Sequence, residues 1–229
     1  MEAQGKNFKA QESNEREAIA PAWHTLCVLA AVAMLSVFSA YARMGSARPR
    51  IGHLILFPTV IAMEWALFGL CLWRSDRNFV EYVGRVWRDA RSLRVDIPVA
   101  LLIGAMCLAA APVVVRVLGK TGWPELGGMR PNGSLEIAMW MAMAISAGVC
   151  EETAFRGYLQ QQFSAWSGHS SIGVLGQAAV FGLAHGYQGW KNIVLIFVIG
   201  CILGCFAMLR KGLRANMIAH ALIDAASAF

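Results

Sequence analysis

Charged residues are scarce in this chain of 229 residues. They make up 15% of it, against 57% hydrophobic residues, whereas a soluble domain usually carries roughly 25% charged residues. A water-soluble fold could not bury so large an apolar excess, and the remainder would cover its surface. The composition excludes a disordered chain, a fibrous protein and a disulfide scaffold. It indicates an all-α, polytopic membrane protein in contact with lipid.

Several signatures of other protein classes are missing. No CxxC pair accompanies the six cysteines, so they are expected to be small buried hydrophobes. The net charge of +6 comes from basic residues between apolar runs; no basic face with interleaved aromatic residues is visible, and no nucleic-acid partner is expected. No HExxH motif indicates a common zincin. Asp224 is the only aspartate in an expected span, which argues against a two-aspartate protease, and no GxSxG indicates a serine hydrolase.

Long apolar runs predict a transmembrane helix bundle with about seven spans. A bilayer core needs about 20 mostly apolar residues per helix. The predicted spans are residues 22–41, 51–73, 97–118 with a kink at Pro112, 135–166, 172–185, 192–209 and 215–229. In the sixth span, Gly200 and Gly204 form a GxxxG motif, which is explained by close helix packing.

The spans divide the chain into three predicted parts. Residues 1–21 form a polar tail, residues 22–134 the N-terminal transmembrane helices, and residues 135–229 a helical core. The basic loop 74–96 has apolar residues at every third or fourth position. This periodicity predicts an amphipathic helix on the membrane surface, with a solvated connector as the alternative.

The Lys and Arg residues of the loops predict the orientation. The loops on the side of the N-terminus hold twelve of them and the loops on the other side hold six. Because cytoplasmic loops carry the excess of basic residues, a cytoplasmic N-terminus is expected, in what we interpret as a bacterial cytoplasmic membrane.

Ionisable side chains inside apolar spans are costly and mark functional sites by default. We single out seven of them, and all but one follow residue 150. They are Glu64, Glu151, Glu152, Arg156, His185, His220 and Asp224. Glu64 is expected to be an internally hydrogen-bonded carboxylate.

Helical spacing gives the two adjacent glutamates different surroundings. Glu152 and Arg156 are four residues apart, so they share a face and can pair. Glu151 points about 100° away and is free to face a cavity. A solvated acidic patch is the alternative, but the segment lies within an apolar pattern. His220 and Asp224 likewise share one face of the last span.

These residues are suited to peptide hydrolysis inside the membrane. A carboxylate and an imidazole can hold and deprotonate one water molecule, and a second imidazole can stabilise the oxyanion. Alternatively, Glu151, His185 and His220 are a sufficient set of zinc ligands. The sequence does not choose between these routes.

Three motifs resemble those of the CPBP family, which groups type II CAAX prenyl endopeptidases with bacteriocin-processing and self-immunity (Abi) proteins. They are Glu151-Glu152-x-x-x-Arg156 followed by Gly157-Tyr158-Leu159, then Phe181-x-x-x-His185 and His220-x-x-x-Asp224. The resemblance covers residues 135–229 and implies an intramembrane endopeptidase with its site between the last four helices.

The resemblance also implies a role for each residue. Glu151 would be the general base, and His185 would help to position the water. His220 and Asp224 would form the oxyanion side, and Glu152 with Arg156 would orient the site. Family members are described as metalloproteases or as glutamic proteases. We favour the glutamic interpretation, which needs no cofactor, because no residue dedicated to supporting a metal ligand is visible.

Three alternatives stay open. Cys150 is a candidate nucleophile for a C-terminal sorting reaction. A non-enzymatic immunity or scaffold protein could bind a peptide in the same pocket, and a transporter could use Glu64, although no internal repeat is apparent. The expected substrate is a membrane-associated peptide or a lipid-anchored protein, of which a prenylated CAAX peptide, a pheromone, a bacteriocin leader and a sorting signal are equally compatible.

The depth of the site depends on the helix lengths. At 1.5 Å per residue, Glu151 lies about 24 Å from the outer start of its helix, and His185 about 20 Å from the inner start of its own. The two meet only if the fourth helix is long and shifted, or the fifth is tilted.

Overall fold

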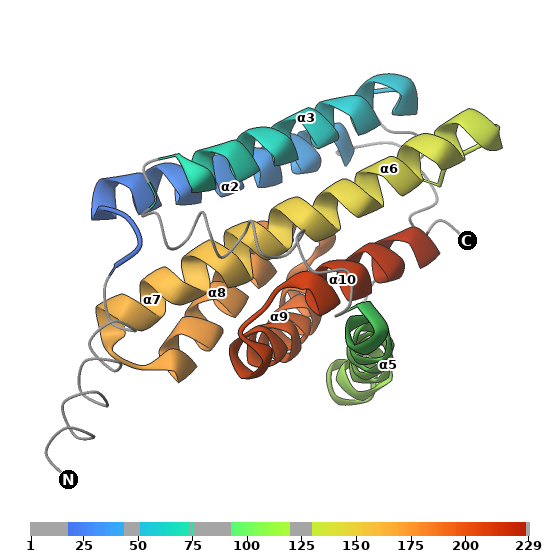
Figure 1. Cartoon of the computed structure of the whole chain (residues 1–229). Helices are drawn as coiled ribbons and strands as arrows, with labels where there is room; N and C mark the ends of the chain where they lie inside the picture. Colours follow the sequence, from blue (N-terminus) through green and yellow to red (C-terminus); the bar gives the residue numbers. More distant parts are fainter. Residues whose placement is uncertain (1–17, 44–50, 74, 76–92, 120–129, 228–229) are drawn as a thin grey trace, which may run out of the picture.

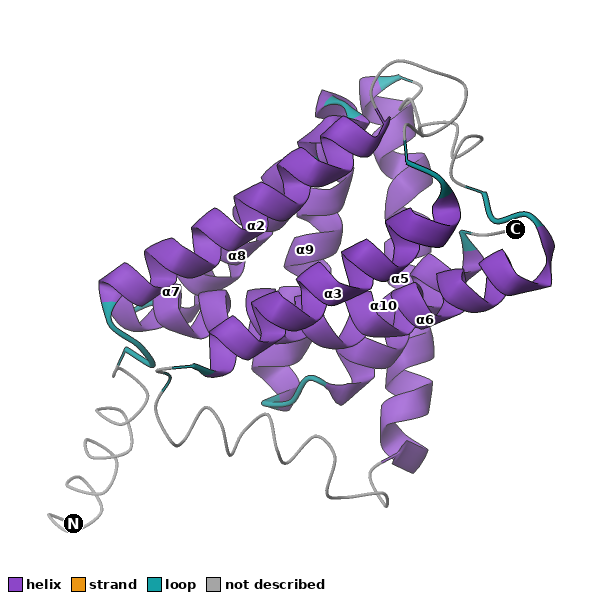
Figure 2. Ribbon diagram, turned by 90° about the horizontal axis from the view of Figure 1, so that it is seen from above, coloured by secondary structure: helices purple, strands orange, loops and turns teal. Residues whose placement is uncertain are grey.

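The computed structural model describes residues 18–43, 51–73, 75, 93–119 and 130–227. All regular secondary structure in these ranges is helical (Figure 2). The α-helices are α2 (Ala22–Arg43), α3 (His53–Leu72), α5 (Leu93–Leu118), α6 (Gly133–Glu152), α7 (Gln160–Ser167), α8 (Ser170–Ala184), α9 (Trp190–Arg210) and α10 (Arg214–Ala226). A π-helical segment, Thr153–Leu159, joins α6 to α7, and a short 3₁₀ helix, Gly186–Gln188, follows α8.

Five helical segments of the described chain are long and apolar enough to cross a membrane. They are α2, α3, α5, α9 and the continuous 35-residue helix from Gly133 to Ser167. The fifth and seventh predicted spans form shorter helices, because α8 has 15 residues and α10 has 13. The structure therefore confirms the polytopic helical bundle. Residues 76–92 of the predicted amphipathic loop and residues 1–17 of the predicted tail lie outside the described residues.

The long helix resolves the depth of the site. In Figure 1, α6 and α7 form one rod that runs diagonally through the bundle, and α8 returns beside it. Glu151 lies 16 residues before Ser167, and His185 lies 15 residues after Ser170. At 1.5 Å per residue, both are roughly 22 to 24 Å from the same turn. The fourth span is thus long, which is the first of the two arrangements that would bring Glu151 and His185 to one depth.

Close packing of α8 against α9 confirms the interpretation of the GxxxG motif. A Cβ atom on Gly204 would lie 2.6 Å from the Gln177 side-chain nitrogen, and one on Gly200 would lie 3.0 Å from Ala178. The Gln177 amide donates to the Gly200 carbonyl at 2.9 Å. Gln160 donates in the same way to Gly204 at 3.0 Å. The two glycines let the helices approach until side-chain amides reach the backbone.

A buried polar network fixes α2 and α3 to the core. His24 is fully buried; its Nε2 donates to the Leu70 carbonyl at 3.0 Å, and a 2.6 Å hydrogen bond joins its Nδ1 to the Tyr158 hydroxyl. The Gln162 amide donates to the Ala20 carbonyl at 2.7 Å. These contacts hold α2 beside α3 (Figure 1), so both helices can form a wall of the cavity described next.

Candidate active site

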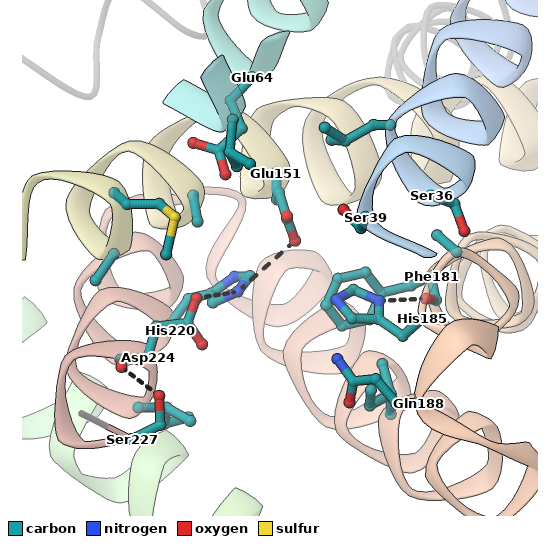
Figure 3. A pocket seen from close by; sticks show the side chains of 18 of the residues that line it. Ser36, Ser39, Glu64, Glu151, Phe181, His185, Gln188, His220, Asp224 and Ser227 are labelled. Carbon is teal, nitrogen blue, oxygen red and sulfur yellow. Dashed lines mark hydrogen bonds and ion pairs between the residues drawn. The ribbon is translucent and has the colours of Figure 1, made fainter. Parts of the chain in front are cut away.

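A cavity of about 860 Å³ lies within the described part of the bundle (Figure 3). Most of its wall is apolar. Its polar lining residues are Ser36, Ser39, Glu64, Arg130, Glu151, His185, Tyr187, Gln188, Asn192, His220, Asp224 and Ser227. The wall includes side chains of α2 and α3 as well as of α6, α8, α9 and α10. The cavity is therefore wider than a site between the last four helices alone.

Glu151 faces this cavity, as the helical spacing predicts. Its side chain is 14% exposed, and its Oε2 lies 3.8 Å from Nε2 of His220. That oxygen is buried and has no hydrogen-bond partner among the described residues. A buried polar atom without a partner is uncommon, and at a cleft it indicates a place for water or ligand. The carboxyl group is thus placed to hold a water molecule.

Glu152 is the structural centre of the site. Its side chain is fully buried, and its Oε1 accepts hydrogen bonds from Arg156 at 2.8 Å and from Nδ1 of His220 at 2.9 Å. Its Oε2 accepts one from the Asn216 amide at 3.2 Å. The predicted pair of Glu152 and Arg156 is present. The sequence analysis did not predict that the same carboxylate holds His220.

Asn216 is a site residue that the sequence analysis missed. It is fully buried, and besides Glu152 its amide donates to the Leu203 carbonyl of α9 at 2.7 Å. It therefore ties α10 to both α6 and α9. The available signal was its position four residues before His220, on the same face of an apolar helix.

His220 is oriented by two carboxylates of different helices. Because a carboxylate only accepts, the bond to Glu152 places a proton on Nδ1 and directs Nε2 toward the cavity. Nε2 lies 3.5 Å from Oδ2 of Asp224, whose side chain is 40% exposed. The predicted pair of His220 and Asp224 is thus formed, and it joins the buried end of the site to its exposed rim.

His185 lies across the cavity from His220, with Glu151 between them (Figure 3). It caps the C-terminal end of α8, and its Nδ1 donates to the Phe181 carbonyl at 2.9 Å. In the neutral ring this makes Nε2 the acceptor. The Phe181 ring lies 4.8 Å from the His185 ring and 5.9 Å from the His220 ring. Phe181 therefore packs against both imidazoles.

The π-helical segment begins directly after Glu152. Inside it, Arg156 is 1% exposed, and its guanidinium lies 4.2 Å from the centre of the Phe181 ring. Segments of this kind are rare and occur frequently at functional sites. Here the segment packs the cation between the Glu152 carboxylate and an aromatic face, so Arg156 supports the site from behind.

The structure does not place Cys150 in the wall of the cavity. Its side chain is fully buried, and it is not among the described residues that line the cavity. Its thiol lies 4.0 Å from the Ser146 hydroxyl, one helical turn earlier. It packs in the helix interface instead.

The candidate metal ligands do not form a metal site in this arrangement. Among the described residues, no three His, Cys, Asp or Glu side chains lie close enough together to hold an ion. Glu152 holds Nδ1 of His220 and directs Nε2 toward the cavity, an arrangement that would support a metal-ligating imidazole. The spacing of Glu151, His185 and His220 is therefore what does not fit a metal ion in this arrangement.

Comparison with known proteins assigns the segment that carries this site. Residues 133–226 match the family model for type II CAAX prenyl endopeptidase, Rce1-like. The C-terminal helical core is a Rce1-like domain of the CPBP family. The matched segment starts with α6 and ends with α10, so it contains every predicted site residue except Glu64, whose role the sequence left open. No curated protein and no solved structure matches the chain.

The family assignment gives the activity at a coarse level. The Rce1-like family is a protease family, and the described helices include five that can cross a membrane. The family assignment therefore classes this domain with the CAAX-type intramembrane endopeptidases. Helices α2, α3 and α5 lie outside the match.

Proposed function

We propose that this protein hydrolyses a peptide bond of a membrane-associated or lipid-anchored substrate with a water molecule activated by Glu151. One observation carries the proposal. The Glu151 carboxyl has a buried oxygen without a partner in a cavity of about 860 Å³, and it lies between two imidazoles (Figure 3).

The proposed reaction uses each residue where it lies. A water molecule binds between the Glu151 carboxylate and the His185 imidazole; the carboxylate takes its proton, and the hydroxide attacks the carbonyl carbon. A protonated His220 donates from Nε2 to the oxyanion, with Glu152 and Asp224 offsetting its charge. As the intermediate collapses, Glu151 returns the proton to the leaving amine. The oxygen of the water molecule and one of its protons are then in the new carboxyl group, and its other proton is on the amine.

The test is hydrolysis by the whole chain in liposomes. The peptides are a farnesylated C-terminal CAAX peptide, its unprenylated counterpart, and single-span peptides with polar tails. We expect cleavage of at least one of them, with one ¹⁸O atom in the new carboxyl group after a single turnover in labelled water. Intact peptides in every case would remove the hydrolase proposal.

Cleavage is expected to survive the loss of Cys150. Replacing it with alanine removes a buried thiol that does not line the cavity, so turnover stays within about 3-fold of the wild type, since only packing changes. Cys71→Ala is the matched control, because Cys71 is also fully buried, in α3. Loss of turnover in Cys150→Ala alone would instead support a sorting-type reaction through that thiol.

Chelators are expected to leave the turnover unchanged. No three donors among the described residues converge on one point, and the water is activated by a carboxylate in the proposed reaction. The measurement is the cleavage rate before and after dialysis against 1,10-phenanthroline. Inhibition that added Zn²⁺ reverses would decide for the metal-dependent alternative.

A further inference from the structure

Glu64 is a second buried carboxyl in the wall of the same cavity. It lies in α3, outside the matched family segment, and is 2% exposed. Ser146 of α6 is a neighbouring hydroxyl, but the described residues show no hydrogen bond between the two side chains, so the internally hydrogen-bonded carboxylate predicted from the sequence is not confirmed. Oε2 of Glu64 is buried without a hydrogen-bond partner, and Glu64 forms no ion pair with any residue that the structure describes. The proposed hydrolysis does not use it.

The surroundings of Glu64 are apolar. The lining residues about one turn away on its own helix are Val60 and Leu67, and the lining residues of α6 are apolar except Glu151. A carboxylate in such a wall is costly unless a cation and hydrogen bonds offset its charge. The buried cation nearest to the site in sequence, Arg156, already pairs with Glu152. Among the described residues the wall thus holds an acidic group with no cation beside it, and a basic group of a ligand could supply one.

The balance of charged groups in the wall favours a cationic ligand. Three carboxyl groups line the cavity, those of Glu64, Glu151 and Asp224. Arg130 is the only Lys or Arg side chain among the described lining residues. Complementary charge selects a partner and fixes its register more than it adds affinity. A substrate with a basic side chain would satisfy the unpartnered oxygen and leave Glu151 to its water.

We propose that Glu64 is a specificity-determining residue that binds a lysine or arginine side chain of the substrate close to the scissile bond. The proposal rests on the proposed function. Ser146, which marks the position of Glu64 along α6, precedes Glu151 by five residues, or ~7.5 Å at 1.5 Å per residue. An extended peptide rises ~3.3 Å per residue. The basic residue therefore lies within about three residues of the bond that is cut.

The first experiment compares peptides that differ at one residue. In a peptide that the protein cleaves, lysine, norleucine and glutamate are placed in turn at each of the three positions on either side of the scissile bond. At one position we expect lysine to be preferred over norleucine by roughly 30-fold in kcat/KM, mainly through KM, as for one buried charge pair. In Glu64→Gln this ratio falls to about 1, and Glu64→Asp restores part of it.

The control variant carries the same Glu→Gln substitution at a glutamate outside the cavity. Glu136→Gln replaces a carboxylate of α6 that pairs with His53 at 2.7 Å and does not line the cavity, and it should keep the preference for lysine. A wild-type protein without that preference, or an unchanged ratio in Glu64→Gln, overturns the proposal. If Glu64→Gln fails to fold, the test is the ratio of kcat/KM for the lysine and norleucine peptides in the wild-type protein.

A binding experiment separates this proposal from the proposed function. The affinities of the lysine and norleucine peptides are measured on Glu151→Gln protein in nanodiscs, with and without Glu64→Gln. Tighter binding of the lysine peptide that depends on Glu64 supports the cation site even if no peptide is ever cleaved. Equal affinities overturn it even if cleavage is observed.

Discussion

Glu151→Gln is expected to lower kcat by about 10³-fold while the protein stays folded. The amide is nearly isosteric with the carboxyl but cannot take a proton from water, and a positioned general base contributes typically 10²–10⁴-fold. Because Oε2 of Glu151 has no hydrogen-bond partner among the described residues, the substitution breaks no hydrogen bond of that oxygen and weakens only its 3.8 Å contact with Nε2 of His220. The measurement is single-turnover cleavage in liposomes together with thermal unfolding of the same sample.

Two comparisons make this result decisive. Glu136→Gln carries the same substitution in the same helix at a residue that does not line the cavity, and it should retain turnover. An immunity or scaffold protein that only binds a peptide would keep its cellular effect in Glu151→Gln. Undiminished cleavage in this variant would show that another group activates the water.

The neighbouring substitution, Glu152→Gln, is expected to destabilise the fold. Its carboxylate is fully buried and holds Arg156, His220 and Asn216 together. Removing one partner of a buried ion pair leaves the other charge uncompensated, which costs about 3–5 kcal/mol. For a chain of this size that is a decrease of roughly 10 °C in the melting temperature. The measurement is thermal unfolding in detergent.

A double-mutant cycle tests the cause of that loss. If the uncompensated guanidinium is responsible, replacing Arg156 with methionine in the Glu152→Gln background should recover part of the stability. The substitutions of the two adjacent glutamates then differ in effect. Glu151→Gln lowers the activity and keeps the stability, whereas Glu152→Gln lowers the stability. Equal melting temperatures for the wild type and Glu152→Gln would contradict the structural role of this carboxylate.

The agreement between sequence and structure is best for relations within one helix. The pairs Glu152–Arg156 and His220–Asp224 follow from a spacing of four residues, and both are present. The direction of Glu151 away from Glu152 follows from the helical rotation per residue. The apolar composition likewise determined that the fold is a membrane helix bundle. These features depend on backbone geometry and hydrophobic burial, which a sequence specifies locally.

Tertiary structure alone decided which residues of different helices meet. The contact of His220 with Glu152 spans 68 positions, and it depends on how closely α10 approaches α6. That approach requires Gly148, where a Cβ atom would lie 2.6 Å from the Met217 carbonyl. The place of Glu64 in the cavity wall has the same origin. Distances between helices are set by packing over their whole length, and no local spacing in the sequence records them.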